Sequence, residues 1–254
     1  MGYLDVNLGA AGRLMLAAGL IGFGLICLIF AAPTDGLAPT SGPDMDLVFT
    51  SRLLGVAWLA TAILISVPRL LYAGQVAGFF VVMMLLLMHA AVAYGSRTWP
   101  SVVGWVSIAE LLGIAAGLVA LRPRTPESAR AAPVIVGAML ILFGVVHWLY
   151  VDAIAGMIPA WMPGRTVWPL LTGTANIAAG LAIASGVLAR PASALVGAMF
   201  ASWILLVHTP RILAASGDRS EWVACALAFA LTGVVWTVNG ALHQSGGDLQ
   251  SQPR

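Results

Sequence analysis

"RLMLAAGLIGFGLICLIFAA", residues 13–32, is the stretch that decides the fold class of this chain. One charged residue, Arg13, precedes 19 uncharged residues, Leu14 to Ala32. A helix of that length rises about 28 Å, close to the thickness of about 30 Å of a bilayer's hydrocarbon core. The small residues that follow also suit a signal peptide, but the apolar segment of a signal peptide has only about 7–15 residues. We therefore predict a retained helix that spans a membrane.

The rest of the chain has the same character. Hydrophobic residues make up 60% of the 254 residues, charged residues make up 9%, and the mean hydropathy is +0.96. A water-soluble domain could not cover so much apolar surface with polar side chains. All the basic residues are Arg and the acids nearly balance them, so we expect no nucleic-acid partner. The pattern predicts an all-α integral membrane protein with eight transmembrane helices, at about residues 13–32, 49–67, 70–94, 101–121, 132–155, 166–188, 192–213 and 221–241.

The two halves of the chain resemble each other. "LLLMHAAVAYG" in the third predicted span aligns with "ILLVHTPRILA" in the seventh, which pairs His89 with His208 at a shift of 119 residues. Roughly the same shift pairs Gly24 with Gly144, and the polar segment "RPRTPESAR", residues 122–130, lies between the halves. Such self-similarity predicts two tandem four-helix bundle repeats. The expected organisation is a first repeat at 1–122, a cytoplasmic linker at 123–130, a second repeat at 131–242 and a disordered cytoplasmic tail at 243–254.

The charges between the spans predict the orientation. If the N-terminus is inside, the inner segments hold seven Arg and three acids, whereas the outer segments hold five Arg and six acids. Cytoplasmic loops of membrane proteins are enriched in basic residues, so both termini are expected in the cytoplasm. The predicted location is the cell membrane, with membrane lipids as partners.

Several polar side chains inside the spans need an explanation, since such groups at membrane depth cost about 2.5–3.5 kcal/mol on insertion scales. If the third and fourth spans form a hairpin, His89 and Glu110 differ in depth by about 6 Å. They would then form a proton relay or a polar wall for a quinone head group. Alternatively, Glu110 is protonated and holds helices together by a hydrogen bond. The candidate polar membrane site comprises His89, Glu110, His147, Asn176, His208 and Arg211.

His208 and Arg211 lie three residues apart and share a helix face, with Pro210 loosening the turn between them. The pair would bind an anion or a quinone carbonyl at the outer interface. The alternative is that Arg211 only extends to lipid head groups. His147 and Tyr150 repeat this spacing in the fifth span.

The segment "AGMIPAWMPGRTVWP", residues 155–169, breaks its own helix with three prolines. We predict that it forms an interfacial hook between the fifth and sixth spans, either a plain anchor or a lid over a path for a lipid-soluble ligand. Tryptophan rings favour the membrane interface, and Arg reaches phosphates. The hook residues are Trp161, Pro163, Arg165 and Trp168.

Cofactor binding is predicted only in a limited sense. Cys27 and Cys225 are isolated in apolar runs and indicate neither a metal site nor a disulfide framework. Haem needs two facing histidines, and nothing in the spacing selects a pair, so haem is disfavoured. We expect no intrinsic cofactor and no metal, with quinone as the candidate ligand and the catalytic residues unknown.

The segment "LILFGVVHWLYVDAIAGMIPAWMPGRTVWPLLTGTANIAAGLAIASG", residues 140–186, resembles the core repeat of the DoxX-like (DoxX/DoxD-type) family of small membrane proteins. The resemblance covers roughly residues 131–240, and the first half only by its pattern of spans. It implies a four-helix membrane unit associated with membrane redox, including the small subunit of thiosulfate:quinone oxidoreductase. Many relatives have an acidic residue where this chain has Asn176, so this chain lacks an ionisable group at that position.

These observations favour a DoxX-like accessory subunit of a membrane redox system that contacts quinone or another lipophilic small molecule. It would act beside a redox partner subunit, and we lean towards no catalytic activity of its own. One alternative is a small-molecule transporter built from two parallel four-helix repeats. Another is a membrane assembly factor in which Glu110 docks a partner helix.

Overall fold

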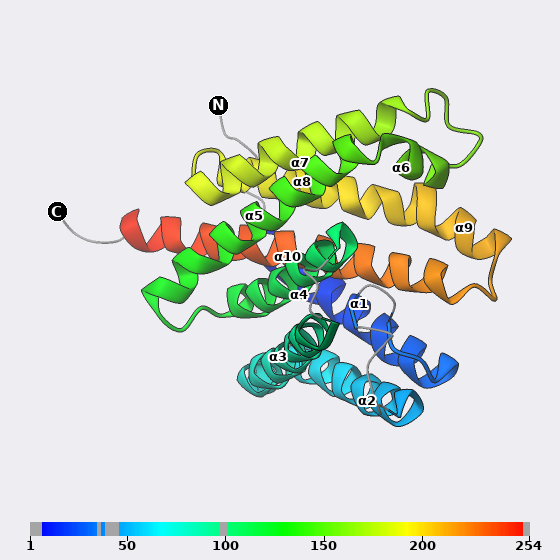
Figure 1. The fold of residues 1–254 in the computed structure, drawn as a ribbon. Coiled ribbons are helices and arrows are strands. Elements are labelled where there is room, and N and C mark those ends of the chain that lie inside the picture. Colours follow the sequence, from blue (N-terminus) through cyan, green and yellow to red (C-terminus); the bar gives the residue numbers. More distant parts are fainter. Residues whose placement is uncertain (1–6, 35–36, 39–45, 97–100, 251–254) are drawn as a thin grey trace.

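The computed structural model describes residues 7–34, 37–38, 46–96 and 101–250 (Figure 1). Within them, eight helical segments are long and apolar enough to cross a membrane. The predicted class, an all-α multi-pass membrane protein with eight such helices, is therefore confirmed. The helices are α1 (Gly9–Phe30), α2 (Leu47–Ser66), the 3-10 helix η1 (Pro68–Leu70), α3 (Leu71–Ser96), α4 (Val102–Leu121), α5 (Pro126–Leu149), α6 (Val151–Met157), α7 (Val167–Ser185), α8 (Ala189–Trp203), the π-helix η2 (Ile204–His208), α9 (Thr209–Ala214) and α10 (Arg219–Gln250).

α5 differs from the prediction at both ends. A capping box forms at its start, because the Thr125 hydroxyl accepts the backbone N–H of Ser128 and the Ser128 hydroxyl accepts that of Thr125. The helix therefore begins at Pro126, and most of the predicted linker 123–130 belongs to its first turns. It ends at Leu149 instead of 155, because the backbone leaves helical geometry at Tyr150 before α6 starts.

α10 extends further than the sequence predicts. It continues to Gln250, into the segment predicted as a disordered tail from residue 243, while 251–254 lie outside the described residues. Asn239 attaches this part of α10 to its neighbours by donating to the Arg190 carbonyl (2.9 Å) and accepting from the backbone N–H of Leu8 (3.4 Å). Arg190 Nη2 also lies 2.7 Å from His243 Nδ1, so His243 is a packed residue.

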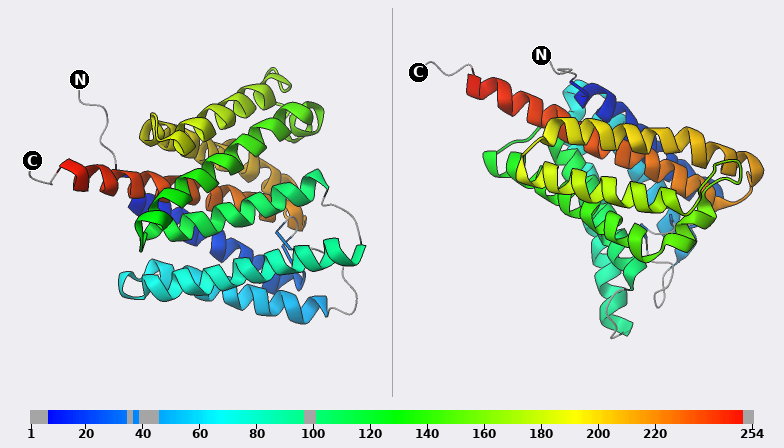
Figure 2. Two further views of the ribbon diagram at one scale, coloured as in Figure 1. Left: turned by 60° about the vertical axis from the view of Figure 1, so that its left-hand side comes forward. Right: turned by 90° about the horizontal axis from the view of Figure 1, so that it is seen from above.

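α1 and α10 lie side by side at the centre of the bundle, with α2 and α3 on one side and α7 and α8 on the other (Figures 1 and 2). Small residues allow their backbones to approach. A Cβ added at Gly12 or Gly19 of α1 would come 2.5 Å from a backbone nitrogen of α10. Helices in lipid associate through this kind of close packing. The seam joins the first long helix to the last, so the two halves share one core.

Equivalent positions make the same contact in both halves. Gly24 of α1 packs against the carbonyl oxygen of Gly55 in α2, and Gly144 of α5 packs against that of Gly173 in α7. Gly24 and Gly144 are 120 residues apart, and Gly55 and Gly173 are 118 apart, close to the shift of 119 found in the sequence. The internal repeat stays a prediction. If it is correct, the same glycine contact is expected in both halves.

The periphery of the bundle is strongly apolar. Large aliphatic and aromatic side chains on five different helical segments point outward and are between 67% and 79% exposed. Such a surface is unfavourable in water and matches acyl chains. The most exposed of these side chains include Ile29, Phe80, Leu195, Leu205 and Leu213.

Candidate functional site

The three membrane histidines lie toward one end of the bundle. α3, α5 and α8 all run from the end where α1 begins, and His89, His147 and His208 follow their starts by 18, 21 and 19 residues. The three histidines therefore all lie in the later turns of their helical segments, although His89 belongs to the first half and the other two to the second.

His89 holds a loop. Its Nε2 lies 3.1 Å from the carbonyl oxygen of Leu37, a buried residue in the connection between α1 and α2. Because a carbonyl can only accept, Nε2 carries the proton in this contact. The bond fastens the α1–α2 connection to the last turns of α3, which is a structural role.

Glu110 is buried, with 7% of its surface exposed. It precedes Gly117 by two helical turns and so shares its face of α4, and Gly117 packs against Val234 of α10. Glu110 therefore faces the boundary where the two halves of the chain meet. In the described part of the chain the ring of His89 is bonded to Leu37 and not to Glu110, so the proposed relay between them stays a hypothesis.

Arg211 forms an ion pair that the sequence reasoning missed. Its Nε and Nη2 donate to the two carboxylate oxygens of Glu221 at 2.6 and 2.5 Å, and its Nη1 donates to the Met157 carbonyl at 3.0 Å. The Arg211 side chain is 32% exposed and that of Glu221 is 12% exposed. This fork joins α9, α10 and the end of α6. The feature of the sequence that could have indicated this ion pair is the presence of opposite charges on the two sides of a short turn between two apolar helices.

The turn of Arg211 and Glu221 also contains Asp218. Its carboxylate accepts hydrogen bonds from the hydroxyl and the backbone N–H of Ser220. These bonds hold the pKa of Asp218 below its usual value. Asp218 therefore stays ionised at the start of α10, where the helix dipole favours a negative charge.

The two histidines of the second half differ in their bonding. His147 Nδ1 lies 2.7 Å from the Phe143 carbonyl, so Nδ1 carries a proton and, in the neutral ring, Nε2 offers a lone pair. His208 ends the π-helical turn before Pro210, and its Nδ1 is buried without a hydrogen-bond partner among the described residues. Wide turns of this type are frequent at functional sites.

Asn176 is the least satisfied polar side chain of the candidate set. It is 1% exposed, and both its Nδ2 and its Oδ1 lack a hydrogen-bond partner among the described residues. Gly173 and Gly180, one turn before and one turn after it, both pack against α5. Asn176 therefore faces the α5 side of the core. The residue 118 positions earlier, Trp58, also has a buried and unpaired Nε1.

The interfacial hook closes on itself. Arg165 donates to the Gly156 carbonyl (3.1 Å), and the indole of Trp168 donates to the Pro163 carbonyl (3.1 Å). Gly164, at φ +63°, supplies the left-handed backbone of the turn. Trp161 is 63% exposed. The structure thus places Pro159 and Pro163 in a compact turn between α6 and α7, and Pro169 in the first turn of α7.

Trp168 lies in the first turn of α7 and packs edge-to-face against Trp203 of α8, with ring centroids 5.6 Å apart. The contact connects the hook to the helix that carries His208. In the described part of the chain, no three His, Cys, Asp or Glu side chains lie close enough together to hold a metal ion.

Comparisons with known proteins do not assign a function to this chain. No family model, no curated protein and no solved structure matches this chain. The fold and the surface define a multi-pass α-helical membrane protein. Any narrower function has to be argued from the buried polar groups.

Proposed function

We propose that this protein is a membrane subunit that binds quinone, or another lipophilic molecule with a hydrogen-bonding head group, in its second half. The observation that carries the proposal is the carboxamide of Asn176, which is buried with both polar atoms unpaired among the described residues. A buried polar group without a partner costs about 1–3 kcal/mol. A carboxamide both donates and accepts, so it matches a quinone carbonyl or a quinol hydroxyl.

Two histidines of the same half support the proposal. The Nε2 lone pair of His147 accepts a proton or a hydrogen bond, as the release of a quinol proton requires. The buried Nδ1 of His208 has no partner in the described part of the chain. The guanidinium of Arg211 is bonded to the carboxylate of Glu221, so the proposal assigns Arg211 no contact with the ligand.

The resemblance of residues 140–186 to DoxX-like proteins agrees with such a role. We propose an accessory subunit of a membrane redox system at the cell membrane, with both termini in the cytoplasm. A quinone supplies the electron chemistry when it is bound, and a partner subunit exchanges electrons with it. The residues of this chain bind and orient the head group and exclude water.

The test is a visible spectrum of the detergent-purified protein with and without dithionite, followed by organic extraction and mass spectrometry for quinones. We expect a protein without a Soret band that retains quinone. Asn176→Leu should lose the quinone, while Trp58→Phe, which removes the corresponding unpaired atom of the first half, should retain it. A Soret band, an empty wild-type extract or equal quinone in both variants would overturn the proposal, and an empty extract would favour the transporter or the assembly factor.

A further inference from the structure

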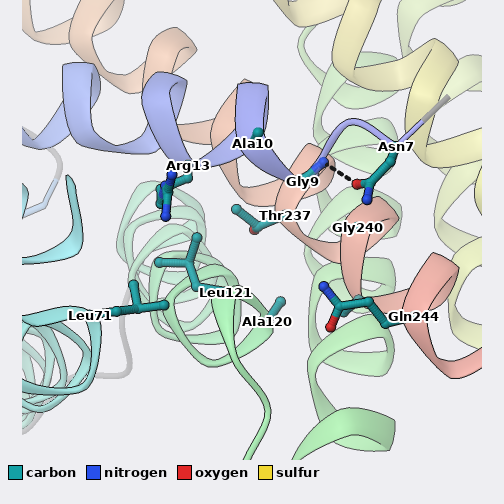
Figure 3. Close-up of a pocket in the computed structure, with 11 residues that line it drawn as sticks. Asn7, Gly9, Ala10, Arg13, Leu71, Ala120, Leu121, Thr237, Gly240 and Gln244 are labelled. Atoms are coloured by element: carbon teal, nitrogen blue, oxygen red, sulfur yellow. Dashed lines mark hydrogen bonds between the residues drawn. The ribbon is translucent and has the colours of Figure 1, made fainter. Parts of the chain in front are cut away.

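A cavity of about 190 Å³ lies at the end of the bundle opposite to the histidines. It forms where α1 begins, α3 begins, α4 ends and the last turns of α10 pass (Figure 3). Its volume corresponds to about six water molecules at about 30 Å³ each, which is enough for a phosphoryl group. The cavity uses other helix faces than the proposed quinone site, so a ligand bound in it is independent of the quinone proposal.

The charge of the cavity comes from Arg13 on α1. Its Nε is buried and has no hydrogen-bond partner in the described part of the chain. Of the described lining residues, Arg13 is the one with a formal charge, and none of them is a carboxylate. A guanidinium in an open pocket whose described lining is otherwise uncharged provides a binding site for an anion.

Further hydrogen-bond donors surround the cavity. The Oδ1 of Asn7 accepts the backbone N–H of Gly9 at 2.9 Å, which leaves its Nδ2 as a donor. Gln244 supplies a second carboxamide from α10. The start of α1 lies beside them, and its dipole adds to the positive potential. Figure 3 shows Asn7 and Gln244 on one side of the pocket and Arg13 on the other.

The remaining wall of the cavity is apolar. Leu71, at the start of α3, and Leu121, at the end of α4, lie on the side of Arg13 (Figure 3). Both residues are at the ends of membrane-spanning helices, where the polar and hydrocarbon regions of a bilayer meet. A ligand with a phosphate and an adjoining apolar part would satisfy both walls.

We propose that this cavity binds an anion of the phosphate type, with the Arg13 guanidinium as its main contact. Two sources share this chemistry, the head group of an anionic phospholipid and a soluble phosphate compound. The Arg-rich end of the bundle is the one predicted to face the cytoplasm, where anionic lipids attract basic residues. A ligand bound in this cavity would contact both α1 and α10 at the end of the seam between them.

The experiment uses the full-length protein after exhaustive removal of lipid in detergent. Native mass spectrometry measures the retention of phosphatidylglycerol against phosphatidylcholine, and calorimetric titration with inorganic phosphate tests the soluble source. The variants are Arg13→Gln and, as a control with the same change of charge, Arg69→Gln, since Arg69 is exposed at the same end and outside the cavity. Ala10→Phe fills the cavity from an exposed position without changing its charge.

We expect at least one of the two ligands to bind to the wild type. Arg13→Gln should weaken that binding about tenfold to hundredfold, as the loss of a charge-assisted hydrogen bond requires. Ala10→Phe should weaken it too, and Arg69→Gln should leave it within about twofold. Binding of phosphatidylglycerol alone would identify a lipid site, and binding of phosphate alone a site for a soluble ligand. Absence of both, or equal losses in Arg13→Gln and Arg69→Gln, would overturn the proposal.

Discussion

Replacing Asn176 with leucine separates binding from stability. Leucine has nearly the shape of asparagine, but it has no polar atoms to leave unpaired. Relief of the unpaired carboxamide contributes about 1–3 kcal/mol to the free energy of unfolding. The hydrophobic effect adds little, because the reference surroundings of a membrane helix are themselves apolar. The slightly larger volume of leucine opposes part of this gain through overpacking.

The net gain expected for Asn176→Leu is about 1–2 kcal/mol in protein stripped of ligand. For a chain of this size, each kcal/mol raises the unfolding midpoint by about 2–4 °C. The variant should therefore unfold about 2–8 °C above the wild type when both are stripped of quinone. Adding a quinone at one hundred times its dissociation constant stabilises a binding protein by about 2.7 kcal/mol. The wild type should gain this increment and the variant should not. Added quinone should therefore reduce the difference between the two unfolding midpoints or reverse their order.

The assay is thermal unfolding in detergent, monitored by circular dichroism, with and without added quinone. Trp58→Phe serves as the control and should gain the same increment from quinone as the wild type. A stripped Asn176→Leu protein that unfolds below the wild type would show that the carboxamide has a partner such as water, and the reasoning from an unpaired group would fail. Equal gains from quinone in the wild type and in Asn176→Leu would place the ligand elsewhere.

Three further predictions concern helix packing, the Arg211–Glu221 ion pair and the orientation in the membrane. Gly19→Ala should destabilise the protein by about 1–3 kcal/mol, because its Cβ would lie 2.5 Å from the backbone of α10, whereas Gly156→Ala, with open space around it, should be nearly neutral in the same unfolding assay. Glu221→Ala should lower stability by about 1–3 kcal/mol, less than for a fully buried pair since Arg211 is partly exposed, and Arg211→Met in the same background should restore part of the loss. In a background without native cysteines, Trp161→Cys should react with a membrane-impermeant maleimide added outside intact cells, and labelling only after lysis would reverse the predicted orientation.

Local patterns in the sequence were sufficient for part of the structure. The length of an apolar run decides whether a helix can span a bilayer, and the eight runs were recognised on that basis. The helix ends depend on finer signals. The capping box at Thr125 and Ser128 sets the start of α5, and its sequence, in a segment rich in proline and charge, was interpreted as a linker.

The candidate site needed the tertiary structure. His89 bonds to Leu37, 52 residues away, and the unpaired state of Asn176 depends on what α5 places around it. The pairing of Arg211 with Glu221 depends on how a short turn brings α10 back against α9. None of these contacts follows from the spacing of residues along one helix.

The sequence by itself determined the class of this protein, the number of its spans and the residues that lipid would not tolerate. Only the tertiary structure decided which of those residues are satisfied, and it brought Arg13 together with the ends of α4 and α10 to form a cavity. The physical reason is that a membrane helix is apolar on nearly every face. Hydropathy therefore specifies that a helix enters the bilayer, whereas its rotation and its neighbours are set by the close packing of small residues such as Gly12 and Gly19.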